Sequence, residues 1–275
     1  MSEAVACRPP ARFSPGRVYA MLLRYLYLLR GSWPRALELV YWPTIQMVLW
    51  GFTSQFLATN SSYVAQAFGV LLAAVLLWDV LFRGQLGVSM SFFEEVWSRN
   101  LGHLFVSPLR PQEWICALLA MSLVRVAIGV LPAALLAIPL YGYSVFGLGP
   151  PLVAFFAELM VFSWALGLMV CALVLRHGQG AEGMAWLAIF VLAPVSAVYY
   201  PVSVLPVWLQ WVAWLLPSAH VFEGMRAAMF DGVFRLDHFA WATLLDLAYL
   251  GLGVAVFLRA IRGARERGTL LQMGE

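Results

Sequence analysis

The chain contains no lysine, because all seventeen of its basic residues are arginine. A Walker A loop needs a lysine that reaches the phosphates of the bound nucleotide. The absence therefore excludes the chain from the P-loop ATPases. Any ATP is expected to be used by a partner, and the chain itself is not predicted to be an enzyme.

Charge of either sign is also scarce. Charged residues make up 11% of the 275 residues and hydrophobic residues 63%, whereas an ordinary soluble chain has about 25% charged residues. Residues 39–78 form a stretch of forty without one charged side chain, and two similar stretches lie within 125–158 and 182–223. One bilayer crossing takes about 20 residues. The sequence therefore predicts an all-α integral membrane protein.

Cysteine and histidine are few. Cys7, Cys116 and Cys171 are predicted at the cytoplasmic side, so no structural disulfide is expected. Their spacing resembles no zinc site. His220 and Glu223 lie three residues apart but lack an evident third ligand, so no metal site is predicted.

The N-terminal region predicts a surface helix. Residues 1–13 lack an apolar run, so a cleaved signal peptide is not expected. Ser14 and Pro15 are typical of a helix start, and an amphipathic helix is predicted over residues 14–33. Its apolar face contains Val18, Leu22, Leu26 and Leu29. That face suits the membrane interface, and the alternative is packing on other protein.

The remaining hydrophobic pattern predicts six spans in one membrane domain over residues 1–275. The spans are expected at about 36–58, 64–83, 113–141, 152–175, 184–204 and 239–259, the first five within 36–204. A polar segment at 84–112 follows the second span, and an outer segment at 205–238 precedes the sixth. Fourteen arginines, Arg83 among them, fall on one side and only Arg226 and Arg235 on the other. Arginine marks the cytoplasmic side, so both termini are predicted to be cytoplasmic.

The segment at 84–112 is predicted to contain a helix at about 90–106. Its apolar stripe leaves Glu94, Glu95 and Arg99 facing away, with Glu95 and Arg99 four residues apart. Pro108 ends the helix, since proline disfavours helix in the residue before it. Such a helix either docks on a cytoplasmic partner or only connects two spans.

The outer segment is too short to cross a bilayer. Ten apolar residues between Pro206 and Pro217 extend only about 15 Å as a helix, which suggests a re-entrant or interfacial piece. Ser218 is expected to cap a second short helix that ends near Asp231. One continuous helix kinked at Pro217 is the alternative. The first piece carries an aromatic stripe of Trp208, Trp211 and Trp214.

Ionisable residues inside spans are candidates for function because each is costly in lipid. Arg125, Glu158 and Asp246 are in this class. Arg125 and Glu158 differ in depth by roughly 12 Å, so a water-filled cavity or another helix is expected to compensate Arg125. For Glu158 and Asp246 the alternative is snorkelling or structural hydrogen bonding. Asp79 and Arg83 are expected near the inner end of their span, within reach of water.

Two segments resemble the permeases of the type-2 ABC exporter family, such as those for nodulation factors and O-antigens. The first is the acidic pair Glu94-Glu95 followed by Pro108-Leu109-Arg110-Pro111. The second combines Leu205-Pro206, Leu216-Pro217, Glu223-Gly224, Arg226 and Gly232. The sequence departs from the family pattern at residues 100–103, where Gly-Thr-Leu is common.

The resemblance implies partners and roles. Two six-span subunits, expected to be identical, would form the pathway in the bacterial inner membrane with two separate ATPase subunits, which would bind ATP and Mg²⁺. Membrane lipids are expected partners and nucleic acid is not. The substrate would be amphipathic, lipid-linked, saccharide-type or a drug. Coupling to the ATPase would involve Glu94, Glu95, Arg99 and His103, and an outer gate Trp208, Trp211, Trp214, Pro217, Glu223 and Arg226.

Two other functions fit the composition. One is a transporter driven by an ion gradient through Arg125, Glu158 or Asp246, although no inverted repeat with matching Gly/Pro-broken spans is evident. The other is a non-transporting membrane assembly factor. Neither is favoured by the two motif segments.

Overall fold

The computed structural model describes residues 13–60 and 62–267. The regular elements of this part are all helical, which confirms the predicted all-α class. They are α1 (Pro15–Arg30), α2 (Trp33–Asn60), α3 (Ser62–Trp97), α4 (Leu101–Val106), α5 (Pro111–Tyr141), η1 (Val145–Leu148), α6 (Pro150–His177), η2 (Gln179–Ala181), α7 (Met184–Val195), η3 (Val202–Val204), α8 (Val207–Trp214), α9 (Pro217–Phe230) and α10 (Leu236–Arg267). Cys7 and the two chain ends, predicted to be cytoplasmic, lie outside the described residues.

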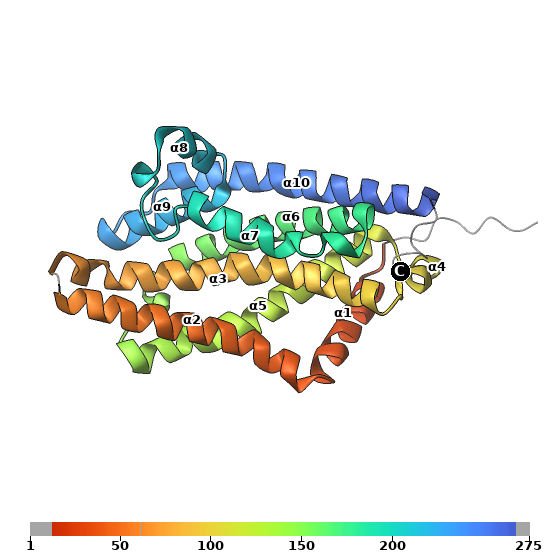
Figure 1. Cartoon of the computed structure of the whole chain (residues 1–275), viewed down its shortest axis with the longest axis horizontal. Helices are drawn as coiled ribbons and strands as arrows, with labels where there is room; N and C mark the ends of the chain where they lie inside the picture. Colours follow the sequence, from red (N-terminus) through yellow and green to blue (C-terminus); the bar gives the residue numbers. More distant parts are fainter. Residues whose placement is uncertain (1–12, 61, 268–275) are drawn as a thin grey trace, which may run out of the picture.

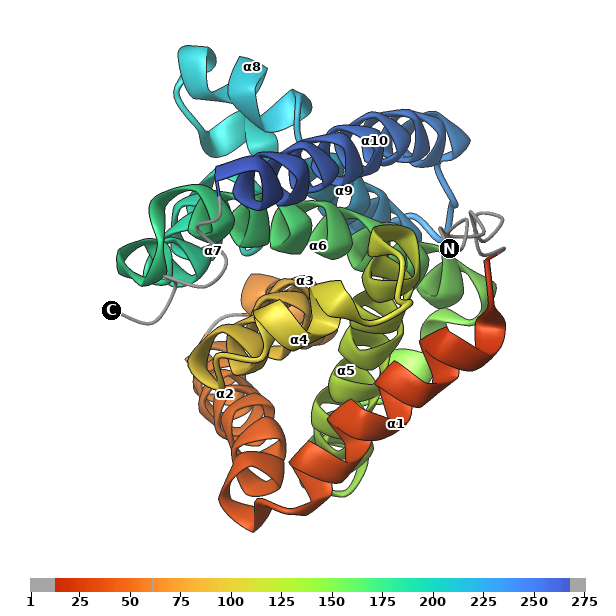
Figure 2. The same cartoon turned by 90° about the vertical axis from the view of Figure 1, so that its right-hand side faces the viewer.

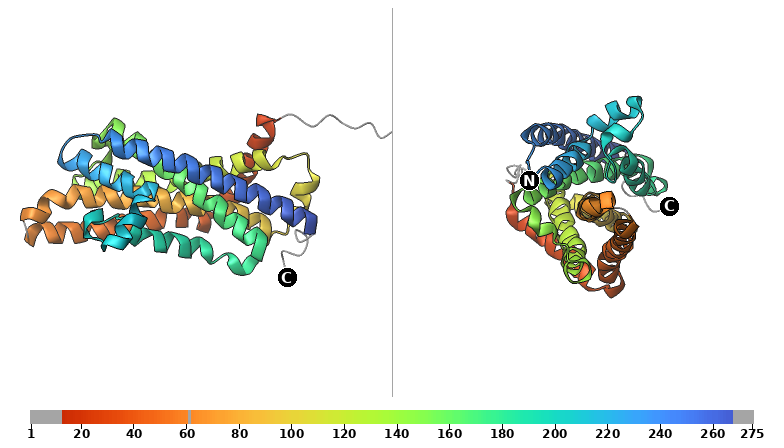
Figure 3. Two further views of the ribbon diagram at one scale, coloured as in Figure 1. Left: turned by 90° about the horizontal axis from the view of Figure 1, so that it is seen from above. Right: turned by 90° about the vertical axis from the view of Figure 1, so that its left-hand side faces the viewer.

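The long helices form a bundle, and several of the short ones lie toward its ends. Figures 1 and 3 show α2, α3, α5, α6 and α10 running along the long axis. Helices α1 and α4 lie at one end with the last turns of α10, and α8 and α9 lie toward the other end (Figure 1). Figure 2 looks at the first end, where α1 runs obliquely past α5. Helix α6 packs along both α3 and α10.

Four helices of the described part are long and apolar enough to cross a membrane: Gly69–Trp97 within α3, α5, α6 and α10. The predicted fifth span at 184–204 is only partly helical, because α7 has 12 residues and ends at Val195. Twelve residues rise about 18 Å, against a hydrocarbon core of about 30 Å. Pro194 lies in its last turn, and Ala197 turns the chain with a φ of 51°.

The predicted polar segment at 84–112 begins inside the bundle. Helix α3 continues to Trp97, because Val88, Phe92 and Val96 are buried against neighbouring helices. Asp79 and Arg83 are therefore far from the helix end. Their side chains are buried, with Arg83 Nε 3.8 Å from Asp79 Oδ1, so the predicted contact of this pair with water is wrong.

Small residues allow close helix contacts. A Cβ placed on Gly253 of α10 would lie 2.8 Å from the backbone oxygen of Ala165 in α6. A Cβ on Gly129 of α5 would lie 2.7 Å from the backbone oxygen of Leu39 in α2. Membrane helices commonly approach each other through such positions. These glycines set the spacing within the bundle.

The segment before α10 forms two helices, which excludes one kinked helix. Leu216, between α8 and α9, has an extended backbone with φ −99° and ψ 129°. Helix α9 begins at Pro217, so the predicted cap by Ser218 is wrong. Proline suits the first helical position, and the Ser218 hydroxyl lies 2.7 Å from that of Ser196.

Candidate functional site

The connection from α3 to α4 is a tight turn. Arg99 has a positive φ of 53°, and Asn100 N–H donates to the Glu95 carbonyl over 3.0 Å. A residue in this left-handed conformation commonly ends a helix. The single helix predicted over 90–106 is therefore wrong, because it is broken between Trp97 and Leu101.

Glu95 anchors α1 to this turn. Its side chain is fully buried, which contradicts the prediction that it faces away from the protein. Its carboxylate accepts from Arg24 Nη2 of α1 over 2.9 Å and from Asn100 Nδ2 over 2.6 Å. The isolated α3 sequence predicts a solvent-facing acid, but docking of α1 covers it.

Glu94 joins three helices and is likewise mostly buried. Its Oε1 lies 3.0 Å from Arg125 Nη2 of α5 and 3.3 Å from Arg35 Nη1 of α2. The Glu94 and Arg125 side chains are each only 8% exposed. The compensation expected for Arg125 therefore comes from another helix, α3.

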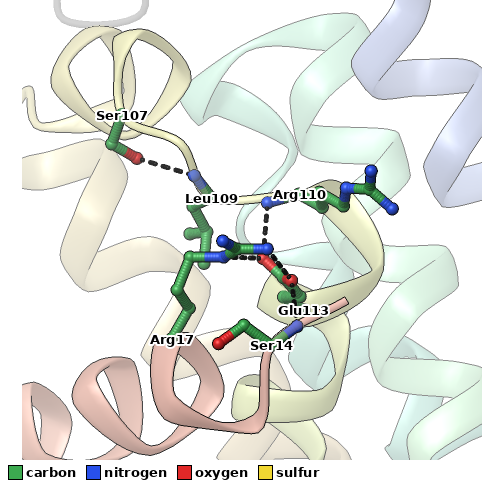
Figure 4. A network of polar contacts seen from close by, with 6 residues as sticks. All are labelled: Ser14, Arg17, Ser107, Leu109, Arg110 and Glu113. Carbon is green, nitrogen blue, oxygen red and sulfur yellow. Dashed lines mark hydrogen bonds and ion pairs between the residues drawn. The ribbon is translucent and has the colours of Figure 1, made fainter. Parts of the chain in front are cut away.

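Glu113 holds the start of α1 on the start of α5 (Figure 4). Its carboxylate accepts from Ser14 N–H over 2.8 Å, from Arg17 Nε over 2.8 Å and from Arg110 N–H over 2.9 Å. The hydrogen bond to Glu113 raises the pKa of Arg17. The sequence pattern contained a signal for this residue, since an acid at the third helical position often bonds back to the residue before the helix.

The apolar face of α1 packs on protein. Met21, Tyr25 and Leu29 are buried, and the Tyr25 hydroxyl accepts from Trp114 Nε1 of α5 over 2.9 Å. Burial, reinforced by the negative charge of Glu95, raises the pKa of Tyr25. This contact agrees with the alternative given for the predicted surface helix, and α1 still exposes Tyr19 on another side.

We call α4 with its anchoring residues the α4 junction. The anchoring residues are Arg17, Arg24, Arg35, Glu94, Glu95, Glu113 and Arg125. Two further contacts join it to the rest of the bundle: Arg265 of α10 lies 4.6 Å from the ring centre of Phe105, and Trp97 Nε1 donates to Glu182 over 2.8 Å.

The outward side of the α4 junction is open. Val106 is 89% exposed and Trp97 45% exposed, and Arg99 and His103 are exposed beside them. Ion pairs thus hold the end of α3 and the start of α5, which flank α4, while an apolar and basic edge remains uncovered. This arrangement suits contact with another protein.

The segment after α7 is tied to α9 by Glu223 and Arg226. Glu223 Oε1 accepts from Val202 N–H over 2.6 Å and lies 3.1 Å from Arg226 Nη2. Arg226 Nη1 also donates to the Ala197 carbonyl over 3.0 Å. Together these bonds pair backbone groups that have no partner within a helix.

The predicted tryptophan stripe divides into two parts. Trp208 and Trp211 of α8 are 69% and 73% exposed. Trp214 instead packs against His220, with ring centres 5.0 Å apart, and stacks on His238 at 5.7 Å. Only the first two tryptophans therefore remain available to lipid or to another protein.

His220 has a contact at each ring nitrogen. Its Nε2 lies 3.0 Å from the Trp214 carbonyl and must carry the proton to donate, and its Nδ1 lies 3.3 Å from His238 Nδ1. Burial lowers the pKa of His220; the Trp214 carbonyl, Asp237 and Glu223 oppose this effect, and His238 adds to it.

Acidification is expected to loosen α9. The pKa of His220 in the folded protein lies below its ordinary value of 6.5, so the unfolded protein takes up a proton on this side chain first. The folded state therefore loses stability as the pH falls below 6.5, by at most about 1.4 kcal/mol per pH unit. Hydrogen exchange of the α9 amides at pH 7.5 and 5.5 measures this. His220→Asn should reduce the dependence, whereas the exposed control His103→Asn should not. Equal slopes in all three proteins would contradict the assignment.

The two acidic residues predicted inside spans come together. Glu158 of α6 and Asp246 of α10 are 6% and 2% exposed, and Thr243 Oγ1 of α10 lies 2.6 Å from Glu158 Oε1. Arg125 is not part of this group, since it pairs with Glu94.

Comparison with known proteins adds a family match. The family model for ABC-2 type transporters matches residues 22–230. The capsule polysaccharide export inner-membrane protein CtrC of Neisseria meningitidis is 33% identical over 105 residues, which are 38% of this chain and 39% of CtrC. The protein of the same description from Haemophilus influenzae, BexB, is 32% identical over 114 residues, 41% of this chain and 42% of BexB. The alignments therefore span about two fifths of each relative, and the family match includes α4, α8 and α9.

Proposed function

Because this chain belongs to the ABC-2 type transporter family, we propose that it is the membrane subunit of an ATP-driven exporter. The observation that carries the proposal is the α4 junction, where a short helix with an open edge follows a segment of α3 that ion pairs fix to α1 and α5. The substrate class that we favour is a saccharide or lipid-linked saccharide. The names of the two relatives, which are capsule polysaccharide export proteins, support this choice.

The proposed topology has six spans with both termini in the cytoplasm. Four are the candidate spans of α3, α5, α6 and α10. Helix α2, with 28 residues, and α7 together with the segment to residue 204 are the other two. The bias of arginine toward one side supports the orientation, even though Arg83 is buried within α3 and no longer counts toward it.

The proposed coupling surface is the open edge of the α4 junction. Trp97, Arg99, His103 and Val106 would contact the ATPase, and Glu94 and Glu95 would position α4 rather than touch the partner. ATP and Mg²⁺ would bind only to that partner, since the chain lacks the Walker A lysine. A displacement of α4 would be transmitted through the end of α3. There Glu95 contacts Arg24 of α1, and Glu94 contacts Arg125 of α5.

The proposed pathway lies between two copies of this chain. Trp208 and Trp211 would stand at its outer mouth, while Pro217 sets the break between α8 and α9 and Glu223 and Arg226 brace it. A cavity of about 240 Å³ beside Arg226, also lined by Tyr199 and Tyr200, offers the aromatic faces and cation that suit a hydroxyl-rich or anionic group.

Val106→Glu is expected to weaken binding of the ATPase about tenfold or more, because a charge buried at an interface without a partner costs more than the 1.4 kcal/mol that corresponds to tenfold. The measurement is recovery of ATPase with the tagged chain from membranes, followed by titration of the purified subunits. Arg99→Glu should act in the same direction, since it reverses a charge on the same edge.

Val233→Glu is the matched control, because Val233 is also exposed and lies between α9 and α10, away from α4. This variant should bind the ATPase normally. Equal binding by Val106→Glu and Val233→Glu, in folded protein, would reduce α4 to a connector. Failure to recover any ATPase with the unaltered chain would reject the exporter assignment itself.

A further inference from the structure

Helices α6 and α10 bring two carboxyl groups together far from either end. Glu158 lies eight residues after Pro150, and Asp246 lies ten residues after Leu236. At 1.5 Å per residue these are depths of about 12 and 15 Å. Both groups therefore lie inside the apolar stretches of their helices, where ionised side chains are costly.

The Thr243 hydroxyl joins Glu158 of α6 to α10. Its oxygen lies 2.6 Å from Glu158 Oε1 and 2.9 Å from the Phe239 carbonyl. A hydroxyl has one proton to donate, and the Phe239 carbonyl already accepts the backbone N–H of Thr243 within α10. Thr243 is therefore the donor to Glu158.

Asp246 lies one turn after Thr243 on α10 and, within the described part of the chain, has no donor of its own. It is 2% exposed, and neither of its carboxyl oxygens has a hydrogen-bond partner among residues 13–60 and 62–267. Residues three apart lie on the same face of a helix, so Asp246 shares the face from which the Thr243 hydroxyl contacts Glu158. Two carboxylates repel each other, whereas a carboxyl group and a carboxylate share a proton. The arrangement is therefore favourable only when the pair holds a proton.

The other charged groups nearby are already engaged. Helix α9 packs against both α6 and α10. Its His220 contacts Trp214 and His238, and its Glu223 contacts Val202 and Arg226. Glu158 is thus the charged side chain that lies across the α6–α10 contact from Asp246.

We propose that Glu158, Thr243 and Asp246 form a proton-binding site inside the membrane, in which one carboxyl group donates to the other and joins α6 to α10. The ligand is a proton. The site is independent of the ATPase and of the exported substrate, so it is tested on the purified chain alone.

Infrared difference spectroscopy in lipid nanodiscs tests the proposal, because the carbonyl stretch of a protonated carboxyl group is distinct from that of a carboxylate. At pH 7 the unaltered protein should show a protonated-carboxyl signal that is lost in Asp246→Asn and in Glu158→Gln. In each variant the new amide donates to the remaining carboxylate. Asp231→Asn, the same change on an exposed residue, should keep the signal. Absence of the signal from the unaltered protein, or its persistence in both variants, would overturn the proposal.

A variant that does not fold is replaced by Thr243→Val, which should shift the frequency of the same signal by removing a hydrogen-bond partner of Glu158. An unshifted signal counts against the site.

Thermal unfolding distinguishes a bound proton from a bound cation. The unaltered protein should lose stability as the pH rises, because the folded state binds the extra proton, and Asp246→Asn should lose this dependence. Stabilisation by Na⁺ over choline at constant pH, abolished in Asp246→Asn, would assign the site to a cation instead.

Discussion

Arg125→Met is expected to lower the free energy of unfolding by about 3 kcal/mol, because loss of one partner of a buried ion pair leaves the other charge uncompensated. Glu94 and Arg125 are each 8% exposed and 3.0 Å apart. Methionine keeps much of the side-chain volume, so the charge is the main change. The second partner of Glu94, Arg35, has a side chain that is 49% exposed and therefore compensates little.

Arg35→Met is the matched control, because it removes the same kind of charge from the same carboxylate. Exposed ion pairs contribute about 0–1 kcal/mol, so this variant should unfold almost like the unaltered protein. Glu94→Gln combined with Arg125→Met removes both buried charges and should recover most of the loss. Denaturant titration in mixed micelles measures all four proteins. Equal effects of Arg125→Met and Arg35→Met would show that burial does not strengthen the inner pair.

Gly253→Ala is the second variant with a large expected effect. The added methyl group would lie 2.8 Å from the backbone oxygen and 3.2 Å from the Cα of Ala165, so α6 and α10 must move apart. Overpacking of this kind costs about 1–3 kcal/mol. The better helix propensity of alanine returns up to about 1 kcal/mol. We expect a net loss of about 1–2 kcal/mol in the free energy of unfolding, measured by the same titration.

Gly251→Ala separates packing from propensity. Gly251 lies in the same helix, and no described atom lies within 4 Å of the position of its added Cβ. This variant should be neutral or more stable by up to about 1 kcal/mol. If Gly253→Ala also proves neutral, the contact between Gly253 and Ala165 does not set the spacing of α6 and α10. A loss of stability in Gly253→Ala with a gain in Gly251→Ala would confirm that it does.

The sequence determined the class of the protein and most helix positions. Long uncharged stretches and a low content of charge require a lipid environment, since no water-facing surface can be built from them. The helix start at Pro15 follows from the fixed φ of proline, whereas the start of α9 was predicted after Ser218 and lies at Pro217. These features depend on residues close together in the chain. The proposed functional segments around Glu94 and Pro217 were also recognisable, because their motifs are local.

Tertiary structure alone decided how the charged groups are used. The partners of Glu95 and Glu113 in α1 are 71 and 96 residues away in sequence, so no local pattern identifies them. Glu95 has the spacing of a solvent-facing acid and is buried because α1 covers it. Glu158 and Asp246 meet only because α6 and α10 pack side by side. Burial and pairing depend on which helix surfaces meet in space, and periodicity along one helix does not contain that information.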